Sequence, residues 1–167
     1  GVFEIGMSKA GEIRKLSNLV KPDIGIITNI GEAHIENFDD LNGIAKAKSE
    51  IIENIKKNGF LILNRDDKYF NYFNKIGKKK KIKVLTFGIS KKSDALLIKN
   101  KSYSGHNILH LKVLNKVFFL KLNNANSLTI LNILSSLLVL SILNLDISKI
   151  KNLANFCNLV EGRGKIH

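Results

Sequence analysis

Several residue types that characterise particular protein classes are scarce in this 167-residue chain, which has one cysteine, one proline and no tryptophan. The single Cys157 excludes an intramolecular disulfide and a cysteine-based zinc site, so we expect a reducing, cytoplasmic setting. Long apolar runs are also missing. The best candidate, residues 128–145, is interrupted by Asn and Ser, whereas a membrane span needs about 18 apolar residues. No signal-peptide pattern is present, and we expect no membrane insertion.

Arginine is the scarce basic residue. The chain has 27 Lys plus Arg and 14 Asp plus Glu, hence a net charge of +13, yet only three of the 27 are Arg. Phosphate and base-edge recognition favour the bidentate Arg fork, and these lysines are scattered rather than gathered in one stripe. We therefore expect no nucleic-acid partner, although the charge keeps a basic nucleic-acid-binding domain open as an alternative of a different class.

Short apolar runs alternate with helical periodicity through the first half of the chain. The pattern predicts strands at 2–5, 24–28, 60–63 and 83–87, and helices at 10–19, 41–55 and 68–76. Runs at 95–99, 108–113 and 117–122 predict a small antiparallel meander, followed by helices at 127–143 and 147–156. The fold class is therefore α/β, a mostly parallel sheet flanked by helices with an added meander.

Polar side chains follow three of the predicted parallel strands. Glu4 closes the first strand, Asn29 and His34 follow the second, and Asn64 and Asp67 follow the third. Ligands of parallel sheets bind beyond the carboxyl ends of the strands, so we expect these residues at one edge. Glu4 is either a functional carboxylate or an exposed edge residue, and His34 alone is more typical of a surface histidine. Together they can supply an oxygen and an imidazole to Mg²⁺, which water and phosphate oxygens would complete.

Lys48 lies on the apolar stripe of the predicted helix 41–55, four residues after Ile44 and three before Ile51, whereas Lys46 points away. An inward lysine either extends its ammonium to water or is held for chemistry, with the charged form disfavoured by burial. A neutral amine can add CO₂ to become a carbamate, in effect a carboxylate on a long arm that can hold a second metal. Glu12, Glu32 and Glu50 are assigned no role and fit helix-start or surface charges.

Seven strings together resemble the central domain of the Mur ligases. They are Glu4-Ile5-Gly6-Met7, Gly11-Glu12-Ile13, Lys21-Pro22-Asp23, Ile27-Thr28-Asn29-Ile30-Gly31-Glu32-Ala33-His34, Ile44-Ala45-Lys46-Ala47-Lys48-Ser49-Glu50-Ile51-Ile52, Asn64-Arg65-Asp66-Asp67 and Gly162-Arg163-Gly164. Within that family the chain most resembles the type that adds D-alanyl-D-alanine to UDP-MurNAc-tripeptide.

The resemblance implies an ATP- and Mg²⁺-dependent peptide ligase that works through an acyl phosphate. It implies that Glu4 and His34 help to hold Mg²⁺ and that Lys48 is carbamylated and serves the same site. It further implies cofactor-binding roles for Asn132 at the adenine and Arg163 at the ribose and phosphates. We also expect Asn29, Asn64 and Asp67, at the strand ends, to bind the cofactor.

The sequence departs from the family at two points. The Gly-Lys-Thr or Gly-Lys-Ser phosphate loop is absent, and Asn126-Ser127-Leu128 stands where the family usually has Gly-x-His before the adenine-contacting Asn. We therefore expect a piece of a longer protein, inactive alone. Residues 1–160 would be a partial central domain with its meander at about 95–122, and 161–167 the start of a linker to a carboxy-terminal domain.

Two alternatives stay open beside the nucleic-acid-binding domain. The first is another Mur or folylpolyglutamate-type amide ligase, and the second is a non-catalytic scaffold in which Glu4, His34 and Lys48 lie far apart. For the leading hypothesis we expect a bacterial, cytoplasmic enzyme that acts as a monomer.

Overall fold

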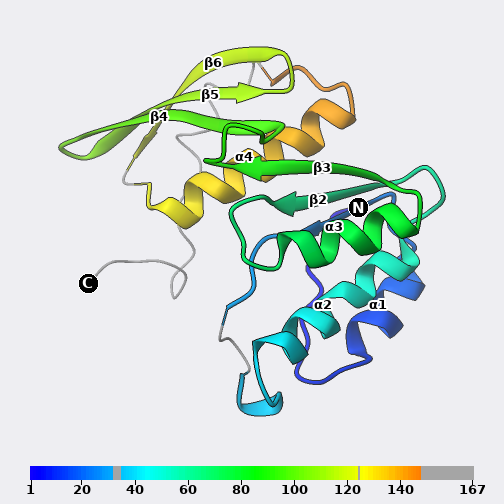
Figure 1. Ribbon diagram of the computed structural model, residues 1–167. Coiled ribbons are helices and arrows are strands. Elements are labelled where there is room, and N and C mark those ends of the chain that lie inside the picture. The colour runs from blue at the N-terminus through cyan, green and yellow to red at the C-terminus, as the bar shows by residue number, and fades with distance from the viewer. Residues whose placement is uncertain (32–34, 124, 148–167) are drawn as a thin grey trace. The chain divides into compact units, whose positions relative to one another are not determined.

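The computed structural model describes residues 1–31, 35–123 and 125–147 and divides into two compact units, Gly1–Thr86 and the part from Phe87 onward (Figure 1). The elements are α1 (Glu12–Val20), β1 (Ile24–Ile27), the 3₁₀ turn η1 (Ile35–Asn37), α2 (Leu41–Asn54), β2 (Phe60–Asn64), α3 (Phe70–Lys79), β3 (Lys83–Gly88), β4 (Ala95–Tyr103), β5 (His106–Val113), β6 (Lys116–Asn123) and α4 (Ser127–Ile142).

The strands form one sheet in the order β1-β2-β3-β4-β5-β6. β1 pairs with β2 in parallel, as β3 does with β4, whereas β4, β5 and β6 are antiparallel. The predicted α/β fold with an added meander is therefore confirmed.

In the first unit, α2 and α3 cover one face of β1 and β2, and α1 lies against α2 (Figure 1). The buried residues of this core are Ile27, Ala45, Ile52, Ile55, Leu61, Leu63, Phe73 and Ile82. Asp40 begins α2, because its side chain accepts a hydrogen bond from the Gly43 N–H at 2.8 Å. This packing fixes the direction in which α2 presents its side chains.

Tight backbone contacts hold the end of α2 against the start of β1. The Lys56 N–H donates to the Pro22 carbonyl at 3.0 Å, and the Phe60 N–H donates to the Asp23 carbonyl at 2.9 Å. Gly59 lies in this contact, where an added Cβ would sit 2.6 Å from the Asp23 carbonyl oxygen. Only glycine fits this close approach without moving the backbone.

In the second unit, α4 packs on the β4–β5 part of the meander. Leu109, Leu111 and Val113 alternate along the buried face of β5, as strand periodicity requires. Asn126 caps α4 by accepting a hydrogen bond from the Thr129 N–H at 2.8 Å. None of the helices in the described ranges is long and apolar enough to cross a membrane.

The strand predicted at residues 2–5 is wrong. None of the six strands of the described residues includes this segment, and Val2 and Phe3 are exposed, at 102% and 64%. An apolar run becomes a strand only when its backbone pairs with a neighbour, and here the paired strands begin with β1. Ile5 and Met7 instead pack against α2. The helix predicted at 147–156 lies, after Ile147, outside the described residues, as does Cys157.

The contact at Gly59 yields a stability prediction. We expect Gly59→Ala to lower the free energy of unfolding by about 1–3 kcal/mol, because the new methyl group meets backbone oxygens that cannot move away independently. Urea denaturation measures the change. Gly6→Ala is the control, since an added Cβ there meets nothing within 4 Å, and an equal loss in both variants would contradict the argument.

Candidate functional site

The residues after β1 and β2 meet at one edge of the sheet. The two strands are parallel and in register, with Ile27 beside Leu63, so the chain leaves both strands at the same level. Asp67, which follows β2, accepts a hydrogen bond from the Ile30 N–H, which follows β1, at 2.9 Å. The expected convergence of the second and third predicted strand ends is therefore present.

Two side chains hold a single peptide group at this edge. Lys48 Nζ donates to the Asn29 carbonyl oxygen at 2.8 Å, and Asp67 Oδ2 accepts from the Ile30 N–H at 2.9 Å. This carbonyl and this N–H belong to the same peptide bond. A cation thus lies at its oxygen and an anion at its nitrogen, matching the direction of the peptide dipole. The second oxygen of Asp67 accepts from the Tyr69 N–H at 2.7 Å.

Lys48 is half-buried on α2, beside the fully buried Ile44 and Ile52. Burial lowers the pKa of its ammonium group, and the nearby negative charge of Asp67 partly opposes that shift. A lower pKa raises the fraction of neutral amine at a given pH, and the neutral amine is the form that reacts with electrophiles. The inward position predicted for Lys48 is confirmed, and the side chain donates to a backbone carbonyl rather than extending only into water.

The segment that carries Glu4 packs on the same part of α2. Ile5 and Met7 belong to one apolar cluster with Ile44 and Ala47 of α2, and Ile30 packs against it. Glu4 itself is exposed. One cluster thus supports the Glu4 segment, the peptide held by Lys48, and the face of α2 around Lys48.

Two of the predicted cofactor-binding residues shape the loop after β2. Asn64 is buried, and its side-chain oxygen accepts from the Asp66 N–H at 2.9 Å, which closes the turn. Both oxygens of Asp67 are engaged by backbone N–H groups. Asn29, by contrast, is exposed, and its side-chain oxygen accepts from the Thr28 hydroxyl at 3.3 Å.

The remaining predicted site residues are His34, Arg163 and Asn132. His34 and Arg163 lie outside the described residues. Asn132 is exposed on α4 in the second unit, where its backbone carbonyl accepts hydrogen bonds from the hydroxyls of Ser135 and Ser136 at 2.8 and 2.9 Å. Its role at the adenine stays a prediction.

Of the residues predicted to hold Mg²⁺, Lys48 fits that role in only one chemical form. No group of three or more His, Cys, Asp or Glu that could hold a metal ion occurs in the described parts of the chain. Glu4 offers the hard oxygen that Mg²⁺ prefers. The ammonium of Lys48 repels a cation, and the amine is a poor ligand for Mg²⁺. Lys48 fits a magnesium site only as a carbamate, which carries two oxygens.

Glu50 has a structural role that the sequence did not predict. From the sequence it is assigned no role and is interpreted as a helix-start or surface charge. It is only 6% exposed and accepts hydrogen bonds from backbone N–H groups at the beginning of α1. A usable signal exists in the sequence, because Ala47, Glu50 and Asn54 follow one another at helical spacing and form the stripe that faces α1.

The pKa of Lys48 can be tested by titration. We expect NMR of its side-chain signals, assigned with Lys48→Arg, to give a pKa below the ordinary lysine value of 10.5. Asp67→Asn should lower the pKa further, because it removes the negative charge that favours the ammonium. Asp66→Asn, one residue away and exposed, is the control. A rise in the pKa of Lys48 in Asp67→Asn would contradict the electrostatic assignment.

Comparisons with known proteins identify the family. The model of the Mur ligase middle domain matches residues 1–140. The chain is 38% identical over 172 residues to the UDP-N-acetylmuramoyl-tripeptide--D-alanyl-D-alanine ligase of Rickettsia prowazekii, a match that covers 99% of this chain and 37% of that relative. The chain thus spans little more than a third of the relative's length.

Solved structures agree. MurF from Acinetobacter baumannii matches with a TM-score of 0.88 at 25% identity, over 97% of this chain and 35% of that one. MurF ligase from Thermotoga maritima, solved in complex with ADP, matches with a TM-score of 0.76 at 28% identity, over 86% of this chain and 33% of that one. Since the family model covers 140 of 167 residues, this chain belongs to the Mur ligase family through its middle domain.

Proposed function

We propose that this chain is part of an ATP-dependent ligase of peptidoglycan precursor synthesis that joins D-alanyl-D-alanine to UDP-MurNAc-tripeptide. The name of the Rickettsia relative supports this reaction, and the ADP bound by the Thermotoga structure supports an adenine nucleotide as cofactor. We further propose that the enzyme acts as a monomer in the bacterial cytoplasm, on these two substrates and without a nucleic-acid partner.

In the proposed reaction, a carboxylate oxygen of the tripeptide attacks the γ-phosphorus of ATP, and ADP leaves. The amine of D-alanyl-D-alanine then attacks the carbonyl carbon of the acyl phosphate. A peptide bond forms, phosphate leaves, and the amine loses a proton. The first step brings two anionic groups together and the second expels an anionic phosphate, so the site must offer oriented cationic charge and hydrogen-bond donors. Bound Mg²⁺ would supply part of that charge.

The structural observation that carries the proposal is the peptide group held between Lys48 and Asp67 at the carboxyl edge of two parallel strands. At this edge we assign Asn29 to contact with the nucleotide, and Asn64 and Asp67 to the shape of the loop beside it. We assign Glu4, His34 and carbamylated Lys48 to the binding of Mg²⁺. Asn132 is assigned to the adenine, and Arg163 to the ribose and phosphates.

The environment of Lys48 supports its proposed carbamylation. When a neutral amine adds CO₂, a nitrogen–carbon bond forms and one proton leaves, so the product keeps one N–H and gains a carboxylate. The N–H can still donate to the Asn29 carbonyl, which now accepts from Nζ at 2.8 Å. Burial, which lowers the pKa of the ammonium, favours the neutral amine that this reaction needs.

The activity is tested in the complete ligase that carries this chain as its middle domain. We expect phosphate release from ATP to require both UDP-MurNAc-tripeptide and D-alanyl-D-alanine, because the second amine must capture the acyl phosphate. Replacing D-alanyl-D-alanine by a single diamino acid or by glutamate distinguishes other Mur ligases and folylpolyglutamate-type ligases. Turnover with one of these amines, and none with the dipeptide, would refute the proposed substrate.

Lys48 is tested by substitution in the same assay. We expect Lys48→Ala to lower kcat by about 100-fold or more, because it removes the proposed carbamate ligand of Mg²⁺. A short carboxylate added to the buffer should restore part of the activity by replacing the carbamate. Lys46→Ala is the matched control, since Lys46 lies two residues away on the exposed face of α2. Full activity in Lys48→Ala would eliminate the proposed role.

A further inference from the structure

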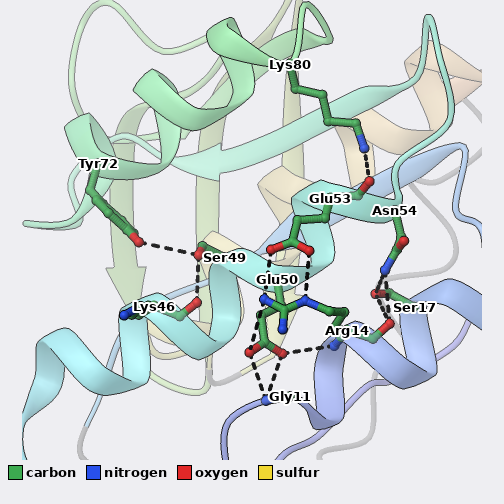
Figure 2. Close-up of polar contacts among 10 residues, drawn as sticks. All are labelled: Gly11, Arg14, Ser17, Lys46, Ser49, Glu50, Glu53, Asn54, Tyr72 and Lys80. Carbon is green, nitrogen blue, oxygen red and sulfur yellow. Dashed lines mark hydrogen bonds and ion pairs between the residues drawn. The ribbon is translucent and has the colours of Figure 1, made fainter.

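Glu50 is a buried carboxylate that reaches from α2 to the beginning of α1 (Figure 2). One of its oxygens accepts from the Gly11 N–H at 2.8 Å, and the other accepts from the N–H groups of Gly11 and Arg14 at 3.1 and 3.0 Å. The Arg14 guanidinium lies 3.9 Å from it. A carboxylate with 6% exposure is tolerated here because donors and a cation surround it.

The beginning of α1 has no cap of its own. Gly11 is the N-cap residue, has φ of 88°, and has no side chain that could accept from the first N–H groups of the helix. Such groups need acceptors, and the positive end of the helix dipole favours a negative charge. Glu50 therefore supplies from α2 the cap that the sequence of α1 does not encode.

A second carboxylate holds the residues just before Gly11. Glu12 Oε2 accepts from the Ser8 N–H at 2.6 Å and from the Lys9 N–H at 3.2 Å, and these hydrogen bonds hold the pKa of Glu12 below its ordinary value. The backbone from Ser8 to Arg14 is thus fixed by Glu12 from within and by Glu50 from α2. The chain that enters this fixed turn is the one that carries Glu4.

Asn54 and Glu53 extend the contact between the two helices (Figure 2). The Asn54 amide donates to the Arg14 carbonyl at 3.0 Å and to the hydroxyl of the fully buried Ser17 at 2.8 Å. The carboxylate of Glu53 accepts two hydrogen bonds from the side chain of Arg14, at 2.8 and 3.0 Å, and the Glu53 side chain is 51% exposed. The backbone carbonyl of Glu53 accepts from Lys80 Nζ. Glu53 is therefore a close comparison for Glu50: it has the same charge, lies on the same helix and contacts the same arginine, but makes none of these bonds to the α1 backbone.

Lys48 and Glu50 are two residues apart on α2 and hold two different segments. Lys48 binds the Asn29 carbonyl, whereas Glu50 binds the turn that follows Glu4. We propose that Glu50 is a positioning residue, which fixes the Glu4-bearing segment against α2 and so sets Glu4 relative to Lys48. This inference rests on the proposed function, in which Glu4 and Lys48 serve one magnesium site.

The test compares Glu50→Ala, Glu50→Gln and Glu53→Ala in the complete ligase. For Glu50→Ala we expect kcat to fall and the Mg²⁺ concentration for half-maximal activity to rise, each by about tenfold, as the loss of hydrogen bonds to a charged group predicts. Glu50→Gln keeps one acceptor oxygen and should recover most of the loss. Glu53→Ala should stay within about twofold of the unmodified enzyme, because an exposed ion pair contributes little.

Amide hydrogen exchange gives a readout that does not depend on activity. We expect Glu50→Ala to speed exchange of the Gly11 and Arg14 amides by about tenfold, with the amides of α2 unchanged, and Glu53→Ala to leave the Gly11 and Arg14 amides as they are. Exchange that rises throughout α2 in Glu50→Ala, with unchanged Mg²⁺ dependence, would reduce Glu50 to a general stabilising role and overturn the proposal.

The outcomes separate the two proposals. If the unmodified ligase does not turn over its two substrates, the proposed function fails. If the ligase is active and Glu50→Ala matches Glu53→Ala in kcat and in Mg²⁺ dependence, only the positioning role fails. Should Glu50→Ala not fold, Glu50→Gln is judged by the same criteria, with a loss smaller than tenfold but larger than in Glu53→Ala supporting the role.

Discussion

The arrangement of the candidate site depends on one peptide group, the bond between Asn29 and Ile30. Its carbonyl accepts from Lys48 and its N–H donates to Asp67, so an α2 side chain and a loop after β2 fix the backbone that leaves β1. The register between β1 and β2 makes this arrangement possible, because the chain leaves both strands at the same level. A shift of β1 by one residue would move this peptide group away from both partners and turn every side chain of the strand to the other face.

The second constraint is that α2 supports two loops at once. Its apolar side chains enter the core of the first unit, and Lys48 and Glu50 leave the helix toward Asn29 and Gly11. Both are long side chains with polar ends, whose burial is tolerated because backbone groups satisfy them. α2 is held in place by its core packing, and its side chains thus hold two segments that have no regular secondary structure. The proposed phosphoryl transfer requires such support, since its donors must be placed before the charge develops.

Much of this fold could be predicted from the sequence, because its signals are local. Apolar periodicity predicted α2 and the meander, and it also placed Lys48 on an inward stripe. The failures involve information that periodicity does not carry. Residues 2–5 satisfy a strand pattern, but pairing is a non-local property. Glu50 lies in a mixed stripe, Ala47-Glu50-Asn54, and a search for apolar spacing passes over it because two of its three residues are polar. Asn64 lies at the predicted edge of the sheet, but its side-chain oxygen accepts a hydrogen bond that closes the turn after β2.

The net charge at Lys48 links the proposed carbamate to the metal. As an ammonium, Lys48 is attracted by the nearby Asp67, whose charge raises its pKa against the effect of burial. Carbamylation changes the charge of Lys48 from +1 to −1 and so turns this attraction into repulsion in a half-buried site. Two like charges there are unfavourable unless a cation joins them. We therefore expect the proposed carbamate to be favoured only together with a bound cation such as Mg²⁺, and loss of the cation to favour return of the lysine to its ammonium form.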